Sequence, residues 1–344
     1  MTRKMASIQI IADIQPIEGA DKIVKTQINS WWVVTAIDNN FKVGDLVVYC
    51  ETDSWIPHDL APFLSKGKEP REYNGIKGEK LRTIKLKGQV SQGLILPIDV
   101  MNIKTDTGEY LGSWEEGYDV SETLGIIKYE PPIPACLSGI MRGNFPSQIP
   151  KTDESRIQNL TKEWYDLSQY QYEVTEKLEG SSCTMALVDG EFVVCSRNIN
   201  IVESDDNTFW KMAKQYEVER KMRNESSMNF AIQGEVIGEG IQGNHYGIKG
   251  QDFYVFAIYD ITAQKYVPPR FRMRLCEILN MKHVPIIDEF ASFAGLEIDH
   301  VLKQADGKSR INANVMREGL VFKRVDGQEH FKAVSNEYLI KSGT

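Results

Sequence analysis

The sequence predicts an α+β protein, with an all-β N-terminal part and a C-terminal part that mixes antiparallel strands with helices. Short apolar and β-branched runs separated by Gly, Asn, Asp or Lys fill the first 130 residues, without a long helical pattern. Beyond residue 145, similar runs alternate with stretches of helical spacing, and tight turns such as VDGEF join neighbouring strands. A length of 344 residues makes two domains the natural expectation.

The N-terminal part is expected to form a small barrel of short strands, and the OB-fold is the candidate. The prolines of GIIKYEPPIPA (125–135) then break regular structure. We therefore expect an OB-fold nucleic-acid-binding domain over residues 1–130, a linker over 131–148 and a second domain over 149–344. The expected strands of the first domain are IVKTQI (23–28), WWVVTAI (31–37), DLVVYC (45–50), LRTIKL (81–86) and GLILPI (93–98).

The second domain combines expected strands with three amphipathic helices. Residues 209–224, 270–280 and 292–305 have the apolar spacing of helices. The strands are YEVTEKL (172–178), CTMALVDGEFVVCSRN (183–198, two strands and a turn), NFAIQGEVIG (229–238), FYVFAIYDI (253–261) and GLVFKRV (319–325). This pattern indicates an α+β domain and argues against a doubly wound one.

Composition narrows the class of protein. A net charge of −8 argues against coating of nucleic acid by bulk charge, although a local basic surface stays open. Five scattered cysteines, never in CxxC spacing, fit a reducing compartment. The sequence has neither a secretory signal nor an apolar run of the ~18 residues that a membrane span needs, so we expect an intracellular, cytoplasmic protein. The five histidines form no HxxxH cluster, so a divalent metal should have oxygen ligands, as Mg²⁺ or Mn²⁺ does.

Two lysines stand three residues before a glycine, and the spacing alone decides nothing. Lys85 in KLKG lies in a lysine-rich stretch without acidic company, and we interpret it as a surface residue. Lys177 in EKLEGSS stands between two glutamates. It could form a surface salt bridge, or its amine could be a nucleophile.

The residues downstream of Lys177 favour the nucleophile. They are CSRN (195–198), QGEVIGEGIQGN (233–244), DFYVFAIYD (252–260), REGLVFK (317–323) and HFKAVSNEYLIK (330–341). Together with EKLEGSS (176–182), these segments resemble, in order, motifs I, Ia, III, IIIa, IV and V of the nucleotidyltransferase superfamily, which comprises ATP-dependent RNA and DNA ligases and mRNA capping enzymes. With IPKTDESRIQNL (149–160) ahead of motif I and the barrel first, the whole chain resembles RNA ligases of the Deinococcus/Naegleria type. DNA ligases and capping enzymes carry an OB module after motif V, for which we see no room.

The resemblance implies a nucleotidyltransferase (ATP-grasp-like ligase adenylation) domain and a three-step reaction. Lys177 would attack the α-phosphate of ATP and form lysyl-AMP, AMP would pass to a 5′-phosphate, and a 3′-OH would close the phosphodiester. At pH 7 only about one lysine in 2,500 is neutral, so the nucleophile needs a cationic neighbourhood that favours the free amine.

The resemblance also assigns roles to other residues. Glu179, Glu235 and Glu318 would hold the metal, mainly through water, because Mg²⁺ dehydrates reluctantly. On a continuing strand, Glu179 would share a face with Lys177. For each glutamate the alternative is an exposed charge at a strand end. Phe256 would stack on adenine, unless it is a core residue, and Ala257 replaces an Asp common in relatives. The remaining nucleotide-binding residues would be Glu176 near the adenine amino group, Gly180 of motif I, and Arg197 near ribose or phosphates.

Lys323, Lys332 and Arg156 are the expected phosphate-binding cations, with Lys323 and Lys332 counted as catalytic. Relatives often have KxK in motif V, and Val334 stands where the second lysine would be. The alternative for each cation is a solvated surface position.

The most basic stretch is 66–87, with eight Lys or Arg and three acidic residues. It could track a phosphate backbone, with Trp31, Trp32 or Tyr73 stacking on bases, or it could be a solvated face. The nucleic-acid contacts we expect are Lys66, Lys68, Arg71, Lys85 and Lys87.

The leading prediction is an ATP-dependent RNA ligase that seals 3′-OH/5′-phosphate nicks in duplexes and takes part in RNA repair. Its partners would be ATP, Mg²⁺ or Mn²⁺, and a nicked duplex with an RNA 3′-OH strand, and it would act as a monomer away from membranes. One alternative is a GTP-dependent guanylyltransferase of the capping type. Another is a nucleic-acid-binding protein whose transferase domain is inactive.

Overall fold

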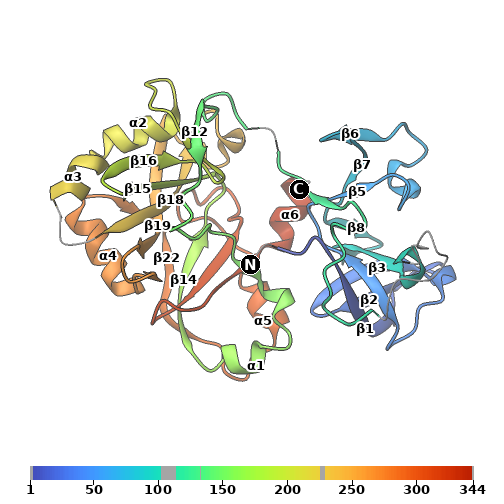
Figure 1. Ribbon diagram of the computed structural model, residues 1–344. Coiled ribbons are helices and arrows are strands. Elements are labelled where there is room, and N and C mark those ends of the chain that lie inside the picture. Colours follow the sequence, from blue (N-terminus) through green and yellow to red (C-terminus); the bar gives the residue numbers. More distant parts are fainter. Residues whose placement is uncertain (1–2, 102–113, 132, 225–228, 343–344) are drawn as a thin grey trace. The chain divides into compact units, whose positions relative to one another are not determined.

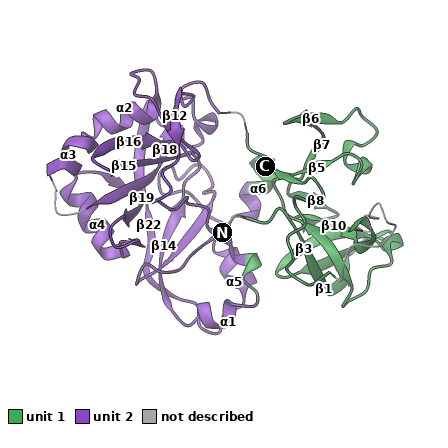
Figure 2. Ribbon diagram, viewed as in Figure 1, with its two compact units in different colours: residues 1–131, 158–161, 339–344 green, residues 132–157, 162–338 purple. Residues whose placement is uncertain are grey.

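The computed structural model describes residues 3–101, 114–131, 133–224 and 229–342 (Figure 1). The chain divides into two compact units (Figure 2). Unit 1 comprises residues 1–131, 158–161 and 339–344, and unit 2 comprises residues 132–157 and 162–338. In the described ranges, no helix has the length and apolar character needed to cross a membrane.

Unit 1 is built around an antiparallel sheet in the order β10-β4-β1-β2-β3. The long strand β1 pairs with β4 along its first half and with β2 along its second, with an irregularity between Ile11 and Asp13. This change of partner within one strand is how a sheet curls toward a barrel. The bounds are β1 (Ala6–Pro16), β2 (Ile23–Ile28), β3 (Trp31–Ala36), β4 (Leu46–Cys50) and β10 (Leu94–Pro97).

A second antiparallel sheet in unit 1 has the order β11-β5-β7-β6, and β8 and β9 form a separate hairpin. Of the stretch expected as one strand at 81–86, only its last three residues are a strand. The bounds are β5 (Ser54–Pro57), β6 (Arg71–Tyr73), β7 (Ile76–Lys80), β8 (Ile84–Leu86), β9 (Gln89–Ser91) and β11 (Ile127–Lys128).

Unit 2 contains two sheets that supply the candidate site. The large sheet has the order β12-β17-β16-β15-β18-β19-β20, with β21 added to β19 in parallel. The small sheet has the order β13-β24-β23-β14-β22, in which only β13 and β24 run parallel among the described strands. The large sheet's strands are β12 (Met141–Asn144), β15 (Ser181–Val188), β16 (Glu191–Cys195), β17 (Ile199–Ile201), β18 (Phe230–Gly238), β19 (Gln251–Asp260), β20 (Lys265–Tyr266) and β21 (Lys282–His283). The small sheet's strands are β13 (Ser155–Arg156), β14 (Gln171–Lys177), β22 (Ile286–Ser292), β23 (Gly319–Arg324) and β24 (His330–Val334).

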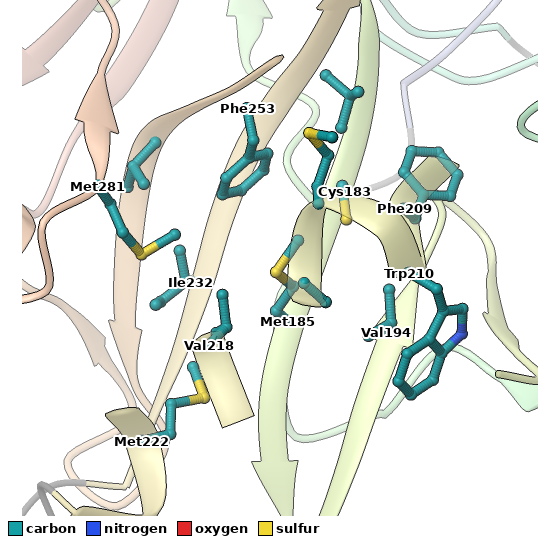
Figure 3. Close-up of a cluster of buried hydrophobic side chains, with 14 of the residues drawn as sticks. Cys183, Met185, Val194, Phe209, Trp210, Val218, Met222, Ile232, Phe253 and Met281 are labelled. Carbon is teal, nitrogen blue, oxygen red and sulfur yellow. The ribbon is translucent and has the colours of Figure 1, made fainter. Parts of the chain in front are cut away.

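Helices α2, α3 and α4 cover one face of the large sheet (Figure 1). Trp210, Val218 and Cys276 from these helices pack with strand residues such as Met185 and Phe253, as Figure 3 shows for the cluster's centre. Because apolar side chains fill the face of the large sheet that the helices cover, the polar residues of a site are expected on the opposite face. The helices are α1 (Trp164–Leu167), α2 (Thr208–Gln215), α3 (Val218–Asn224), α4 (Pro269–Ile278), α5 (Ile298–Lys303) and α6 (Asn336–Ser342).

Two of the three expected helices differ from the prediction. The segment 209–224 is two helices, because Glu217 takes a positive φ of 49° and ends the helical path. The segment 292–305 is helical only over α5, since Ser292 ends strand β22 and Gly295 turns the chain at φ 76°. Helix α4 lies within one residue of its expected start.

The expected linker over 131–148 is largely part of unit 2. Leu137 lies in the main core, and β12 pairs with β17 at the edge of the large sheet. Pro132 lies outside the described residues. The segment 158–161 also departs from the expected boundaries, because it packs in unit 1: the Trp31 Nε1 donates to Asn159 Oδ1 at 2.5 Å.

Candidate active site

Strand pairing brings the expected nucleophile beside a glutamate far away in the sequence. Lys177 is the last residue of β14, and its partner on β23 is Gly319, which directly follows Glu318. The Lys177 Nζ donates to Glu318 Oε1 at 2.6 Å. The small sheet therefore builds this contact from two segments that the sequence separates by 141 positions.

The surroundings of Lys177 differ from the cationic neighbourhood that we expected. Burial would lower the pKa of Lys177, but the carboxylates of Glu318 and Glu235 outweigh this effect and raise it. The chain by itself therefore holds the amine in its protonated form. A charge brought by the substrate or its metal has to change that balance before the amine can act as a nucleophile.

Glu235 faces the same amine from the large sheet. It lies on β18, paired with Ser182 on one side and Tyr254 on the other. Burial raises the pKa of its carboxyl to about 8; Lys177 opposes this shift, and Glu318 adds to it. The upward shift therefore comes mainly from burial, and the neighbouring carboxylate of Glu318 adds to it.

Glu179 is not on the strand of Lys177, so the two residues do not share a strand face as we expected. β14 ends at Lys177, and the Glu179 backbone N–H donates to the Tyr246 hydroxyl at 2.6 Å. Its carboxylate accepts a hydrogen bond from the Tyr338 hydroxyl and lies 3.2 Å from His245 Nδ1. Burial raises the pKa of Glu179. The sequence reasoning selected neither His245 nor Tyr338, although His245 directly follows QGEVIGEGIQGN (233–244) and Tyr338 lies inside HFKAVSNEYLIK (330–341).

Gly180 has a steric reason to be glycine. A Cβ at this position would lie 2.4 Å from the Val236 carbonyl oxygen and within 3 Å of the Ile237 and Glu235 side chains. The turn between β14 and β15 therefore runs against the backbone of β18. This approach brings Lys177 close to Glu235.

The three glutamates can be tested as holders of a metal ion. No group of three His, Cys, Asp or Glu side chains lies close enough for direct coordination anywhere in the described ranges. Glu235 and Glu318 nonetheless both act electrostatically on Lys177, and Glu318 also acts on Glu179. Such a spread of carboxylates fits a cation that keeps part of its water shell, as Mg²⁺ and Mn²⁺ do.

Glu176 lies on β14 of the small sheet, and Phe256 lies on β19 of the large sheet. Glu176 is buried; its Oε2 accepts the Arg310 backbone N–H at 2.7 Å, and burial raises its pKa. Phe256 is half-buried on β19 and packs against a cluster that includes Leu178 and Tyr246. The ring is thus neither a fully enclosed core residue nor a solvated one.

Lys323 is deeply buried, with 1% of its surface exposed, so it is not a surface cation. Its Nζ donates to the Phe256 carbonyl oxygen. Burial, reinforced by the Arg272 guanidinium, lowers the pKa of Lys323 to about 7. Arg272 in turn pairs with the buried Glu173, so a charged network lies beneath the site.

Lys332 and Arg156 are neighbours across the parallel pair β24 and β13. Arg156 is buried, and only 12% of the Lys332 side chain is exposed. Burial lowers the pKa of Lys332 to about 8, although Glu154 and Asp153 act against this shift. Neither cation is therefore a solvated surface charge.

Asp153 joins two of the expected phosphate-binding cations. Its Oδ1 lies 3.3 Å from Lys332 Nζ, and its Oδ2 lies 2.8 Å from the Arg197 guanidinium. The sequence reasoning quoted the segment that holds Asp153 and Glu154 but did not select either acid. Acidic residues directly ahead of a predicted arginine were the available signal.

The expected nucleic-acid contacts lie in unit 1, and their side chains reach solvent. Arg71 donates to Glu79 at 2.8 Å, which neutralises part of its charge. Trp31 is only 1% exposed, so it cannot stack on a base as we considered. Trp32 is half-buried, with the Lys25 ammonium 4.5 Å from its ring. The exposed cations of this set are Lys66, Lys68, Arg71, Lys85 and Lys87.

Family models match both parts of the chain. Residues 171–341 match the RNA ligase family, and residues 5–98 match an OB-fold domain. A comparison with curated proteins found no match.

Solved structures of Naegleria gruberi RNA ligase are similar over nearly the full chain. A variant in its apo form is 43% identical, with a TM-score of 0.89, and the match covers 98% of this chain and 97% of that one. The structure with pyrophosphate has the same identity and TM-score and 98% coverage of both chains. A variant with ATP and Mn has a TM-score of 0.90, 43% identity, and coverage of 99% and 98%. The predicted barrel and antiparallel ligase domain are thereby confirmed, and this chain belongs to the ATP-dependent RNA ligases that carry an N-terminal OB-fold domain.

Proposed function

We propose that this chain seals 3′-OH/5′-phosphate nicks in duplex nucleic acid whose 3′-OH strand is RNA, in RNA repair. The observation that carries the proposal is the contact of Lys177 Nζ with Glu318 Oε1 at 2.6 Å, with Glu235 acting on the same amine. Glu318 gives the amine a proton acceptor, and a cation held by the same carboxylates would favour the free amine that a covalent lysyl-nucleotide requires.

In the first step, Lys177 Nζ attacks the α-phosphorus of ATP. A P–N bond forms, the bond to the bridging oxygen breaks, and pyrophosphate leaves. Before the attack, one proton of the Nζ ammonium passes to Glu318 Oε1, which already accepts a hydrogen bond from it, and a second proton leaves Nζ for solvent once the P–N bond has formed. Each later step is also a displacement at phosphorus: the 5′-phosphate takes AMP from Lys177, and the 3′-OH then expels AMP.

The other residues bind and orient the nucleotide. Phe256 offers a half-buried ring for adenine, and Glu176 lies one residue from the nucleophile with a buried carboxyl of raised pKa. Arg156, Arg197 and Lys332 bind the phosphates, because guanidinium and ammonium groups pair with phosphate oxygens. Lys323 supports the nucleotide site through its bond to the Phe256 carbonyl.

Glu179, Glu235 and Glu318 would hold a hydrated Mg²⁺ or Mn²⁺. The fit rests on the proximity of these carboxylates, since Glu235 and Glu318 both act on Lys177 and Glu318 also acts on Glu179. When bound, the cation supplies positive charge against the phosphate oxygens and disfavours the protonated amine.

Mass spectrometry tests the first step directly. We expect the protein incubated with ATP and Mg²⁺ to gain one AMP on the peptide that contains Lys177, and K177A to gain none. An unmodified peptide in folded wild-type protein would refute the proposal. Labelled GTP in place of ATP distinguishes the capping-type alternative, and the absence of any label would favour the inactive binding protein.

Nicks built with RNA or DNA on each side test the substrate. We expect sealing when the 3′-OH strand ends in RNA, and tolerance of DNA on the 5′-phosphate side. Equal sealing of an all-DNA nick would overturn the requirement for RNA.

We further propose that the protein works as a monomer inside the cell. The five cysteines are free thiols, and four of them are buried, which fits a reducing compartment.

A further inference from the structure

Asp153 connects the two sheets of unit 2 at the end of the site where the phosphate cations gather. Arg197 follows β16 of the large sheet, whereas Lys332 lies on β24 of the small sheet. One carboxylate reaches both, at 2.8 Å and 3.3 Å. Asp153 itself stands two residues before β13, which pairs with β24.

These two cations are also the ones proposed to bind phosphate. A carboxylate and a phosphate present the same kind of partner to them, namely anionic oxygens that accept charge-assisted hydrogen bonds. The Asp153 carboxylate presents such a pair of oxygens to Lys332 and Arg197. The site is therefore occupied by an anion of the chain itself.

We infer that Asp153 is an internal competitor of the nucleotide phosphates: it occupies the place of a phosphate group between Arg197 and Lys332, and pyrophosphate or the triphosphate of ATP displaces it. This inference rests on the proposed function, because it takes these cations to be the phosphate site. It adds a residue that sets the affinity for phosphate and the release of pyrophosphate.

The burial of Lys332 explains why such an anion is present. An ammonium with 12% exposure needs a nearby negative charge to stay protonated, and Asp153 and Glu154 supply it. Once phosphate oxygens take over this role, the Asp153 carboxylate becomes a like charge beside a polyanion. The carboxylate that stabilises the protonated Lys332 then weakens the binding of phosphate.

The geometry also permits the exchange. The Asp153 side chain is 25% exposed and Arg197 is 42% exposed, so both can be solvated when the pair opens. Arg197 lies in a loop between β16 and β17, where a change of side-chain direction leaves the sheet intact. Lys332 is held by its strand and stays in place.

The test is titration of inorganic pyrophosphate into D153N and wild type by calorimetry. We expect D153N to bind pyrophosphate about tenfold more tightly, since it keeps the shape of the side chain but removes its charge. D205N is the matched control: Asp205 is exposed in the same unit and pairs with Lys214, so the net charge changes equally away from the site. D205N should bind as wild type does.

Tighter binding is a result that structural damage would not produce. Equal or weaker binding by D153N would overturn the inference, because the carboxylate would then be positioning the cations. D153S removes the same charge and serves if D153N does not fold, as judged by its melting curve. In an R197Q background, D153N should increase the affinity for pyrophosphate by a smaller factor. One of the two cations for which Asp153 and pyrophosphate compete is then gone.

This readout is separate from the proposed function. Pyrophosphate binding is measured without lysyl-AMP formation, which is tested on wild-type protein alone. If wild type forms lysyl-AMP and D153N binds no more tightly, only the inference about Asp153 fails.

Discussion

Two stretches of this chain share the spacing of a lysine three residues ahead of a glycine, and they have opposite surroundings. Lys85 in KLKG lies on β8 of an exposed hairpin, and Gly88 lies in its turn with φ 83° and no heavy atom within 4 Å of an added Cβ. Lys177 in KLEG ends β14 against Glu318, and Gly180 is pressed against the Val236 carbonyl. Gly88 is needed for its left-handed backbone conformation, whereas Gly180 is needed because the Val236 carbonyl leaves no room for a side chain.

The difference shows that the environment, and not the spacing, makes a lysine a candidate nucleophile. Lys177 has carboxylates from two sheets around it, and Lys85 has solvent. We therefore expect substitutions in the two stretches to have different effects, the largest of them at Lys177.

Replacement of Lys177 should abolish lysyl-AMP formation, whereas replacement of Lys85 should not affect it. We expect K177A to lose lysyl-AMP formation by at least about a thousandfold, because the attacking atom is gone. K85A should form lysyl-AMP at the wild-type rate, because this step uses no nucleic acid. Gel autoradiography with labelled ATP measures both, and a labelled K177A protein would mean that another residue is the nucleophile.

Replacement of Gly180 or Gly88 by alanine should lower the stability of the protein for two different reasons. G180A forces a methyl group to within 2.4 Å of a strand carbonyl, and overpacking of this kind destabilises by about 1–3 kcal/mol. G88A meets no atom but adopts a left-handed conformation, which costs about 1 kcal/mol. Denaturant unfolding measures both changes.

Asparagine at the same two positions sharpens the test. Asn tolerates the left-handed region, so G88N should recover most of the stability that G88A loses, whereas G180N should be at least as damaging as G180A. Recovery of stability in G180N would show that the close approach to Val236 is not what requires glycine.

The sequence predicts the strands of this protein better than its site. Runs such as IVKTQI and GLILPI carry their own strand signal, and their strands lie where we expected. The break between α2 and α3 has no such signal, because it depends on the positive φ of Glu217. Along WWVVTA, side chains alternate between the two faces of the strand, so one tryptophan is more buried than the other. The sequence does not show which of the two, and in the structure it is Trp31.

The site was predictable in its membership and not in its electrostatics. Motif order proposed Lys177 as the nucleophile and Glu318 as a residue that holds the metal, and β14–β23 pairing brings Lys177 next to Gly319, which directly follows Glu318. The raised pKa of Lys177 could not be predicted, because it depends on carboxylates that fold in from a second sheet. Asp153 was missed for a related reason: its place three residues ahead of Arg156 in the sequence gives no sign that it will reach across to Arg197.

A third lysine, Lys323, should make the free energy of unfolding depend on pH. The pKa of Lys323 falls from 10.5 to about 7 on burial, so between these values the unfolded chain holds a proton that the folded chain lacks. Stability therefore rises with pH from about 7 upward through this group, by at most ~1.4 kcal/mol per pH unit. In K323M the slope of unfolding free energy against pH should be smaller than in wild type. K85M, which removes an exposed lysine, should keep the wild-type slope, and a K323M slope equal to that of wild type would contradict the assignment.

The smallest expected effect concerns the basic stretch around Lys85. If Lys85 and Lys87 contact phosphates of a nicked duplex, K85Q/K87Q should bind it a few-fold more weakly near 0.1 M salt, and the slope of log affinity against log salt should fall by about 0.9 for each phosphate that is no longer neutralised. K22Q/K42Q makes the same change of charge at exposed positions of unit 1 outside the stretch and should keep the wild-type slope. Fluorescence anisotropy over a salt series measures both variants. If K85Q/K87Q had the same salt slope as wild type, KLKG would be a solvated face. Of Lys85 and Lys177, only Lys177, which lies among carboxylates, would then have a function.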